Sequence, residues 1–508
     1  MTHPTQRGAR TWRIVLLVAV FAIAAAAIAR SPGRGRARPN VLLVSIDSLR
    51  ADHVGAYGHA KDTTPTIDAL ARDGALCEWA ITSAPWTIPA HATLLSGLPP
   101  EVHGVTSYTR RLAPEAVTLA EALHDAGWDT AAFVSGPTVS ARHGFDQGFA
   151  SFDETVADQL GGKAHQGATS PAVVALVEKF LQRWSDDGRE RPFFVFLHLW
   201  DVHYDYTPPP PYDRMFDPGY EGDLTADDYL RNPRIRRGMD ARDLDHVRAL
   251  YDGEIRFTDD HLGKVVARLR ALGVLDDTIV VVTSDHGDEF FEHGLKGHAV
   301  SVFDEVLHVP LVIRYPRRVA AGLRVTPQVR LMDVSATILG LAGVRAPQGF
   351  GAPGLAERHR ATDLTPALGR GSHAAVPVLP AFSQNLIGVR HESLRTPTAK
   401  LITVTTPRNG KTRTMLYDLA ADPGERTNLA RAETAPPFAA LLQTTLERGA
   451  PRPRARQNCR RGASRSPLRR SGCGRSATSN RSRLVYQSPI SSQPLTPMKS
   501  ALPSETPL

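Results

Sequence analysis

The sequence predicts an α/β fold: a mostly parallel sheet with helices on both faces, plus a small C-terminal α+β subdomain. Two observations carry this prediction, namely continuous apolar runs typical of buried parallel strands and helical patterns between them. Alternation of strands and helices is characteristic of a sheet that is covered on both sides. With 508 residues, the chain is long enough for a large core and for two or three domains.

The elements are expected in the following order. Apolar runs predict buried parallel strands at 40–47, 130–136, 192–203 and 278–287, with a fifth strand at 309–316. Helical patterns lie at 64–74, 115–127 and 251–273, the first two ending in glycine, as helices often do. Beyond about residue 346, a hairpin at 386–406 and a strand followed by a turn at 415–430 predict the small subdomain.

The chain is expected to divide into four parts, 1–38, 39–345, 346–450 and 451–508, and the distribution of charge sets the first and the last apart. The net charge is +8, but residues 1–38 carry +7 and residues 451–508 carry +11, which leaves −10 on residues 39–450. A folded nucleic-acid-binding domain carries its basic patch on the domain itself, so nucleic acid is excluded as a partner. The negative charge of residues 39–450 suits a protein that binds metal cations.

The two ends have their own expectations. Arg7, Arg10 and Arg13 precede an apolar run at 14–29, and this order of charged and apolar residues is that of an export signal. Residues 39–450 are therefore expected outside the cytoplasm. The Ala-rich end of the run suits a cleaved signal, whereas the arginines after it suit a retained membrane anchor. The segment 451–508 is expected to be disordered, with a tail for anionic surfaces or a sequence artefact as alternatives. Cys77 is the one cysteine of residues 39–450, so this part has no internal disulfide.

Metal-binding or proton-transferring side chains stand at the ends of three predicted strands. The first strand ends in Asp47, the third in Asp201 and His203, and the fourth in Asp285 and His286. In sheets of this kind, ligands bind beyond the carboxyl ends of the strands. A single aspartate at the end of a strand can be explained as a turn cap. Three strand ends that all carry such residues are harder to explain in this way.

The stretch APWTIPAHATLLSG at 84–97 places a hydroxyl near the start of a short helix. Pro89 suits the first turn and Gly97 the position after the end, so Thr87 lies where free N–H groups and the helix dipole attract an anion. Thr87 is therefore either a helix cap or a nucleophile facing an anionic ester, and the strand-end cluster makes the two alternatives about even.

From 39 to about 432 the chain resembles the sulfatase family of the alkaline-phosphatase-like superfamily. The matching pieces occur in the family's order: NVLLVSIDSLRADHVGAYG, APWTIPAHATLLSGLPPEVHGV, FLHLWDVHYDYTPP, TSDHGDEFFEHGLKGHAVSVFDEVLHVPLVI and LYDLAADPGERTNLA. The resemblance implies that Asp47, Asp285 and His286 bind a divalent metal ion, and it places Thr87 at the nucleophile position. A Thr87 oxygen would complete four protein ligands. Oxygen-rich ligation suits Ca²⁺, Mg²⁺ or Mn²⁺, and added histidines would favour Zn²⁺.

Two residues depart from the family pattern. Ser48 stands where typical sulfatases have a second Asp, and His91 replaces an Arg. Typical sulfatases oxidise a Cys or Ser to formylglycine, but oxidation of Thr87 would give a ketone, so no formylglycine is expected. Direct attack by the Thr87 oxygen through a covalent threonyl intermediate is expected instead. Superfamily relatives with a Thr nucleophile act on phosphodiesters, which favours phosphorus over sulfur.

Each of the other candidate residues has a functional and a structural interpretation. His91 holds the anion or packs structurally, and His203 contacts substrate or metal or makes a loop hydrogen bond. His298 completes a second metal site, protonates the leaving group or has a structural role. Lys296 pairs with an ester oxygen or is simply solvated. His198, within an apolar strand, is expected to be a packed core histidine.

Three hypotheses for the function follow. The first is an exported or membrane-anchored, metal-dependent hydrolase of a sulfate or phosphate ester, acting on an anionic glycan, lipid or small molecule. The second is a phosphodiesterase or a transferase of the same superfamily that passes a phospho-group to a lipid or glycan. The third is a non-catalytic metal- or glycan-binding module, which the changes at Ser48 and His91 keep open.

Overall fold

The computed structural model describes residues 38–160, 168–351, 359–372 and 374–430. The predicted apolar segment at 14–29 and the predicted tail at 451–508 lie outside these residues. Within the described part of the chain, no helix has both the length and the apolar character needed to cross a membrane.

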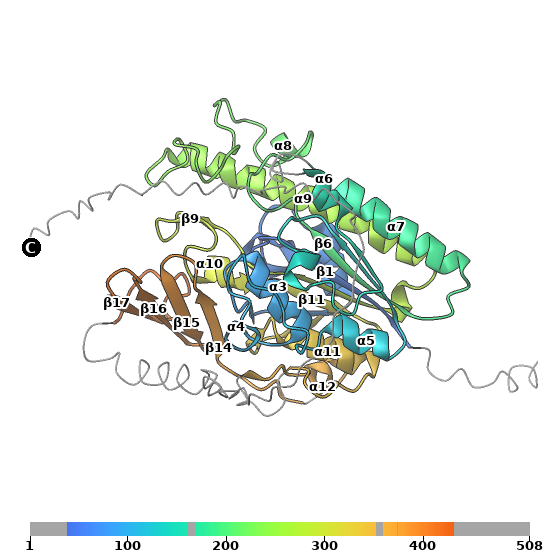
Figure 1. The fold of residues 1–508 in the computed structure, drawn as a ribbon. Helices are drawn as coiled ribbons and strands as arrows, with labels where there is room; N and C mark the ends of the chain where they lie inside the picture. The colour runs from blue at the N-terminus through green and yellow to red at the C-terminus, as the bar shows by residue number, and fades with distance from the viewer. Residues whose placement is uncertain (1–37, 161–167, 352–358, 373, 431–508) are drawn as a thin grey trace, which may run out of the picture. The chain divides into compact units, whose positions relative to one another are not determined.

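An eight-stranded, mostly parallel sheet forms the centre of the molecule, as predicted, in the order β12-β2-β11-β7-β1-β6-β4-β5 (Figure 1). At its middle, β1 pairs in parallel with β6 and β7. All three strands are buried along their whole length, which explains their continuous apolar runs. The strands are β1 Asn40–Ile46, β2 Ala75–Cys77, β4 Asp129–Val134, β5 Ser151–Asp153, β6 Phe193–Leu199, β7 Thr278–Ser284, β11 Leu311–Arg314 and β12 Leu323–Val325.

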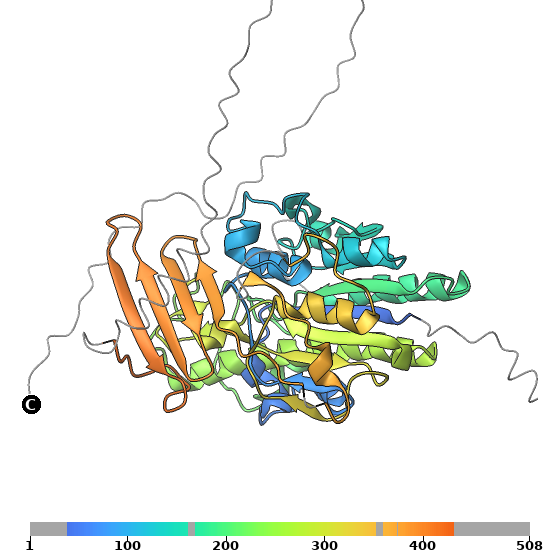
Figure 2. The ribbon, with the colours of Figure 1, turned by 90° about the horizontal axis from the view of Figure 1, so that it is seen from below.

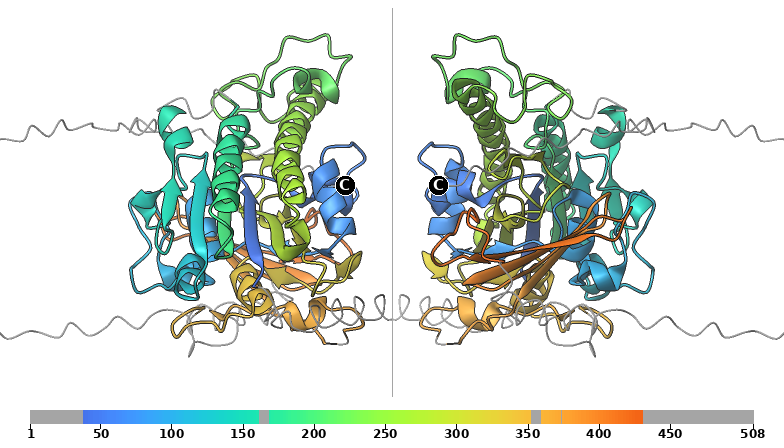
Figure 3. Two further views of the ribbon diagram at one scale, coloured as in Figure 1. Left: turned by 90° about the vertical axis from the view of Figure 1, so that its right-hand side faces the viewer. Right: turned by 90° about the vertical axis from the view of Figure 1, so that its left-hand side faces the viewer.

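Helices cover both faces of this sheet, and the side chains of β1 show which helix lies on which face. Leu42 and Val44 share a core with α2 Pro65–Arg72, α7 Ser170–Asp186 and α9 Ala241–Ala271. Val41 and Leu43, which point the other way, share a core with α3 Thr87–Ser96, α5 Leu119–Asp125 and α11 Asp333–Ala342. The helices α7 and α9 run side by side, both green in Figure 3.

Two expectations about these elements need correction. The strand at 309–316 pairs with β7 in the antiparallel direction, which its apolar run alone did not reveal. The helix predicted at 251–273 begins ten residues earlier, at Ala241, where Asp240 caps its first turn by accepting a hydrogen bond from the Arg242 amide.

The small C-terminal subdomain is an antiparallel sheet of four strands, drawn in orange in Figure 2. Its strands are β14 Ala381–Asn385, β15 Arg390–Arg395, β16 Ala399–Thr405 and β17 Thr412–Asp418, so the predicted hairpin corresponds to β15 and β16. Ile402, Met415 and Tyr417 pack in one cluster with Val302 and Phe303, which lie outside this subdomain, just before residue 304.

Short elements complete the described chain and mostly shape loops. They are η1 Ala51–His53, η2 Gly55–Tyr57, β3 Ala80–Ile81, α4 Pro100–His103, η3 Ala141–His143, α6 Thr155–Leu160, α8 Tyr212–Met215, η5 Leu275–Asp277, β8 Glu289–Phe290, β9 Lys296–Gly297, α10 Asp304–Leu307, β10 His308–Val309, β13 Val329–Arg330 and α12 Thr365–Leu368.

Candidate active site

Two neighbouring strands bring two carboxylates to one edge of the sheet. Ile46 pairs with Ser284, so the residues that follow β1 and β7, Asp47 and Asp285, leave the sheet at the same level. Both side chains are fully buried. His286 follows directly, and ligand atoms of Asp47, Asp285 and His286 lie within 4.8 Å of one another. The structure therefore assembles the three predicted ligands from segments more than 230 positions apart.

Thr87 is the first residue of α3 and lies against this cluster. Its hydroxyl oxygen is 3.3 Å from His286 Nε2, and its side chain is buried. The helix cap is Trp86, in extended conformation, and no side chain caps this end. The capping alternative for Thr87 is therefore wrong, and its hydroxyl lies at the positive end of the helix beside two carboxylates.

The orientation of the His286 ring follows from its hydrogen bonds. Nδ1 donates to the Gly287 carbonyl at 3.1 Å, which leaves the lone pair on Nε2 facing the cluster. Nε2 lies 3.3 Å from Asp285 Oδ2 and 3.6 Å from Asp47 Oδ1. Burial alone would lower the pKa of His286, but the carboxylates of Asp285, Asp47 and Asp288 together raise it.

The electrostatics of the cluster fit a bound cation. Burial raises the pKa of Asp47 to about 7, and burial, together with the nearby Asp47 charge, raises the pKa of Asp285. Asp285 Oδ2 accepts no hydrogen bond from any described residue, although it is completely buried. Buried carboxylates are normally paired or bind metals, so these residues fit a divalent metal ion.

Ser48, which departs from the family pattern, connects the two carboxylates. Its backbone amide donates to Asp285 Oδ1 at 3.2 Å and its hydroxyl donates to Asp47 Oδ1 at 3.1 Å. Its φ of 58° lies in the left-handed region, which is costly for a serine. The Tyr251 hydroxyl, from α9, donates to the Ser48 carbonyl at 2.7 Å and holds this turn in place.

His91 occupies a packed position rather than an open anion site. Its Nδ1 donates to the Thr87 carbonyl at 2.9 Å and its Nε2 accepts from the Ser45 hydroxyl at 3.0 Å. The ring is completely buried, and burial lowers its pKa to about 4. These contacts favour the structural alternative: His91 ties the first turn of α3 to β1 as a neutral ring and does not replace the family's Arg.

His198 does more than fill the core, contrary to expectation. It lies within β6 beside Ser45, and its Nε2 is 3.2 Å from Asp47 Oδ2. Burial lowers its pKa to about 4, so the neutral ring donates to the carboxylate and orients it. Sequence reasoning missed this role because only the pairing of β1 with β6 brings the two side chains together.

Two further histidine rings extend the cluster beyond His286. The ring of His298 lies 4.2 Å from that of His286, and its Nδ1 is 2.7 Å from Asp288 Oδ1. The His203 ring is 4.8 Å from the His298 ring, and its Nδ1 donates to the Tyr204 carbonyl. Asp288 also accepts a hydrogen bond from Tyr206 and was not predicted; its position three residues after Asp285 in DHGDEF is the one signal in the sequence.

Two other predicted residues form their hydrogen bonds with groups outside the cluster of Asp47, Thr87, Asp285 and His286. The Lys296 ammonium donates to the carbonyls of Tyr229 and Ile235, at 2.7 and 2.6 Å, and so holds the loop before α9. Asp201 was expected among the strand-end ligands, but its carboxylate accepts hydrogen bonds from the amides of Thr169 and Ser170, at the start of α7. The role expected of Asp201 is corrected to helix capping.

The pair of Arg50 and Asp52 also shapes the loop after β1. Arg50 donates to both oxygens of Asp52, and its Nη1 donates to Glu292 at 2.8 Å and to the Asp288 carbonyl at 2.9 Å. The buried guanidinium therefore joins the loop after β1 to the loop after β7.

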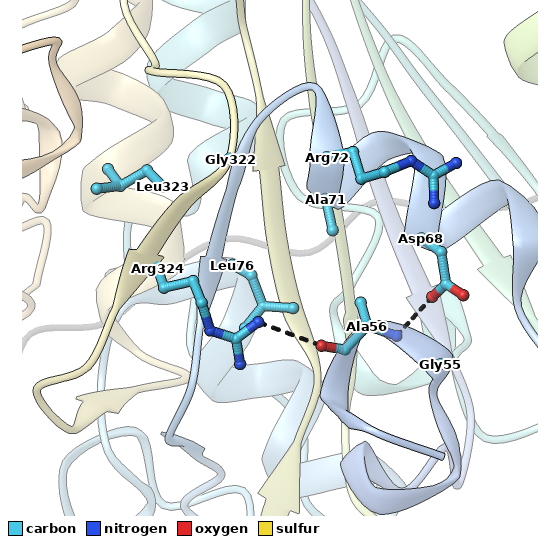
Figure 4. A pocket seen from close by; sticks show the side chains of 9 residues that line it. All are labelled: Gly55, Ala56, Asp68, Ala71, Arg72, Leu76, Gly322, Leu323 and Arg324. Carbon is cyan, nitrogen blue, oxygen red and sulfur yellow. Dashed lines mark hydrogen bonds between the residues drawn. The ribbon is translucent and has the colours of Figure 1, made fainter. Parts of the chain in front are cut away.

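A hollow of about 280 Å³ lies elsewhere, between η2, α2 and β12 (Figure 4). Arg324 and Asp68 line it and contact the carbonyl and the amide of Ala56, respectively. The hollow shares no lining residue with the cluster around Thr87, so it has no part in the chemistry considered below.

Comparison with known proteins decides the family. The model of the sulfatase family matches residues 39–344, and a model described as N-sulphoglucosamine sulphohydrolase, C-terminal, matches residues 292–450. The chain belongs to the sulfatase family. It is thus a sulfatase-like ester hydrolase, with a sulfatase fold.

Individual relatives of this sulfatase-family chain act on different esters. It is 26% identical over 413 residues to an ulvan-active sulfatase of Formosa agariphila, covering 77% of each chain. A structure solved with its substrate D-glucosamine-2-N,6-O-disulfate matches with a TM-score of 0.64 at 20% identity, covering 81% of this chain and 98% of the other. The phosphonate monoester hydrolase of Agrobacterium radiobacter also matches at a TM-score of 0.64, with 24% identity and coverage of 81% and 96%.

Proposed function

We propose that this sulfatase-family enzyme hydrolyses a sulfate or phosphate ester with Thr87 as its nucleophile. The observation that carries the proposal is the 3.3 Å separation of the Thr87 hydroxyl oxygen from His286 Nε2, within a buried cluster that also contains Asp47 and Asp285. The start of α3 adds backbone N–H groups that favour an anionic ester oxygen.

Asp47, Asp285 and His286, together with the Thr87 oxygen, are the residues that would hold a divalent metal ion. When bound, such an ion neutralises ester oxygens and lowers the pKa of a neighbouring hydroxyl. Carboxylate and hydroxyl ligands suit Ca²⁺, Mg²⁺ or Mn²⁺, and His286 also allows Zn²⁺.

The reaction divides into two displacements. In the first, the deprotonated Thr87 oxygen bonds to sulfur or phosphorus while the bond to the ester oxygen breaks, and His298 gives a proton to the departing alcohol. In the second, water attacks the sulfur or phosphorus of the threonyl intermediate and gives a proton to His298, while the bond to Thr87 breaks and returns the deprotonated Thr87 oxygen that the first step requires. The Asp288 carboxylate, 2.7 Å from His298 Nδ1, holds the His298 ring and supports the protonated form that is present before the first step and after the second.

The substrate is proposed to be a sulfated sugar, and the support comes from the ulvan-active relative and from the structural neighbour solved with a disulfated glucosamine. A phosphodiesterase or phospho-transferase activity is the second candidate. It is favoured by Thr87, which excludes formylglycine chemistry, and by the fold shared with a phosphonate monoester hydrolase.

The test is turnover of the full-length protein on aryl sulfate, sulfated sugar, phosphomonoester, phosphodiester and phosphonate monoester substrates. Thr87→Ala is expected to lower kcat about a thousandfold or more, whereas Thr87→Ser retains a hydroxyl and keeps most of the activity. A mass shift on the Thr87 peptide after rapid quenching identifies the intermediate. Wild-type turnover by Thr87→Ala on every cleaved substrate would reject the nucleophile, and a product formed only with an added acceptor would identify a transferase.

We also propose that the enzyme works outside the cytoplasm, exported or anchored through the apolar segment at 14–29. The support is the order of charged, apolar and small residues in that segment. Fractionation of cells that express the full chain, with N-terminal sequencing of the product, distinguishes an anchored from a cleaved form. Recovery in the cytoplasm with an intact N-terminus would refute this proposal.

A further inference from the structure

A second group of metal-ligating side chains lies outside the site described above. His53 and His59 belong to the loop between β1 and α2, and Asp252 lies on α9. One ligand atom from each of these residues lies within 4.8 Å of the others. We propose that His53, His59 and Asp252 form a separate site for a transition-metal ion such as Zn²⁺.

The two imidazoles converge on one carboxylate oxygen. His53 Nδ1 is 2.6 Å and His59 Nε2 is 3.4 Å from Asp252 Oδ1, and the two rings are stacked with centroids 4.8 Å apart. Donor atoms around a four-coordinate zinc ion lie about 3.3 Å from one another, given metal–ligand bonds of about 2.0–2.1 Å. Small side-chain adjustments would therefore let an ion replace the proton between His53 and Asp252.

The other oxygen of the same carboxylate is held separately. The Lys61 ammonium donates to Asp252 Oδ2 at 2.7 Å and leaves Oδ1 to the histidines. Carboxylates that bind metals are commonly anchored in this way through their second oxygen. Although burial opposes ionisation, His53, His59 and Lys61 hold the pKa of Asp252 below its usual range, so the ligand is charged at neutral pH.

The site is also accessible from one side. The Asp252 side chain is 1% exposed, whereas those of His59 and Lys61 are 17% and 37% exposed. An ion can therefore enter past His59, and solvent can supply a fourth ligand. Two imidazoles with one carboxylate suit Zn²⁺, Co²⁺, Ni²⁺ or Cu²⁺ rather than Ca²⁺ or Mg²⁺.

An ion at this site would stabilise the loop that follows Asp47, one residue of the proposed catalytic cluster. The His53 ring packs edge-on against Tyr251, with centroids 4.9 Å apart. The Tyr251 hydroxyl in turn donates to the Ser48 carbonyl at 2.7 Å and accepts from the Arg50 amide at 2.9 Å. Binding would thus fix the turn immediately after Asp47 without placing the ion near the reacting ester.

Metal stoichiometry tests the proposal independently of turnover. Chelator-treated full-length protein is dialysed against Zn²⁺ alone, and bound zinc is counted per chain. His59→Ala is expected to bind one equivalent less than wild type, while the matched control His124→Ala, an exposed histidine on α5, keeps the wild-type number. Equal zinc content in wild type and His59→Ala would overturn the site, whatever the outcome for Thr87.

Cobalt binding provides a second measurement. It distinguishes a metal site from a set of side chains that only hydrogen-bond to one another. Co²⁺ added to wild type is expected to give the visible absorption bands of nitrogen-ligated cobalt, and these bands are reduced in His53→Gln and His59→Gln. The glutamine variants retain hydrogen bonding, and circular dichroism verifies their folding in chelator. Cobalt bands that are unchanged in both glutamine variants would overturn the proposal.

Discussion

The backbone amide of Ser48 donates a 3.2 Å hydrogen bond to Asp285 Oδ1 and so joins the ends of β1 and β7. The same residue donates through its hydroxyl to Asp47 Oδ1. Ser48 therefore fixes the spacing of the two carboxylates even though it lacks the carboxylate that typical sulfatases have at this position. Its left-handed φ of 58° is the conformational cost of this arrangement.

Replacing Ser48 by Asp is expected to strengthen metal binding. Asp tolerates the left-handed region better than most residues, and it adds a third carboxylate beside Asp47 and Asp285. The dissociation constant for Mg²⁺ or Ca²⁺ is expected to fall by about tenfold, or about 1.4 kcal/mol, measured by titration calorimetry on chelator-treated protein. Ser48→Asn is the neutral control of the same shape. Equal metal affinities in the two variants would show that the added carboxylate does not contribute to metal binding.

Removing the His91 ring is expected to destabilise the protein. The ring is completely buried and joins the Thr87 carbonyl to the Ser45 hydroxyl, so His91→Ala leaves a cavity and unpaired polar groups. A loss of about 3 kcal/mol in the free energy of unfolding is expected, measured by urea titration. The exposed His124→Ala should change this free energy by no more than about 0.5 kcal/mol. A His91→Ala protein as stable as the control would show that the ring is not a structural bridge.

The sequence predicted the residues whose signal is local. Asp47, Asp285 and His286 follow long apolar strands, so their place at the carboxyl edge of the sheet could be predicted from the chain alone. The role of His198 could not, because it depends on the register that sets β6 beside β1. A histidine inside an apolar strand has no local feature that distinguishes a packed ring from one that orients a carboxylate.

Loops explain most of the other differences. Lys296 binds carbonyl groups in the irregular segment at 229–235, whose path no periodic pattern predicts. The first ten residues of α9 were missed because charged residues interrupt the apolar ones in the stretch ARDLDHVRAL, which packs only partly against the core. In both cases the deciding interaction is tertiary, so propensity and periodicity could not reveal it.

Lys400 is expected to be essential for docking of the C-terminal sheet. Its ammonium is completely buried and lies 2.7 Å from Asp304 Oδ1 and 3.0 Å from Glu425 Oε1. Lys400→Met removes the buried positive charge between the two carboxylates and should cost about 3–5 kcal/mol in the free energy of unfolding. Asp304 keeps its ion pair with Arg395, at 2.9 Å, so Glu425 is the carboxylate that loses its partner. Adding Glu425→Gln to Lys400→Met removes this unpaired charge and should restore part of the stability. If the double variant is less stable than Lys400→Met, the loss does not arise from unpaired charge.

Asp259 is expected to make stability depend on pH. Its carboxylate, on α9, accepts hydrogen bonds from the amides of Thr66 and Ile67 in the first turn of α2, at 2.7 and 3.0 Å. Burial nevertheless raises its pKa to about 7, above the value of about 4 expected in the unfolded chain. Between about pH 4 and pH 7 the folded state therefore holds a proton that the unfolded state has lost, and the contribution of Asp259 to stability falls as pH rises.

The corresponding variant is Asp259→Asn, which cannot ionise. The free energy of unfolding of wild type minus that of Asp259→Asn is expected to decrease from pH 4 to pH 7, by at most about 4 kcal/mol for a shift of about three pKa units. Urea titrations at several pH values measure this difference. The exposed Asp125→Asn is the control, because a surface carboxylate on α5 should give a nearly constant difference. A difference for Asp259→Asn that increases with pH would show that the hydrogen bonds from α2 outweigh burial and that the pKa is lowered instead.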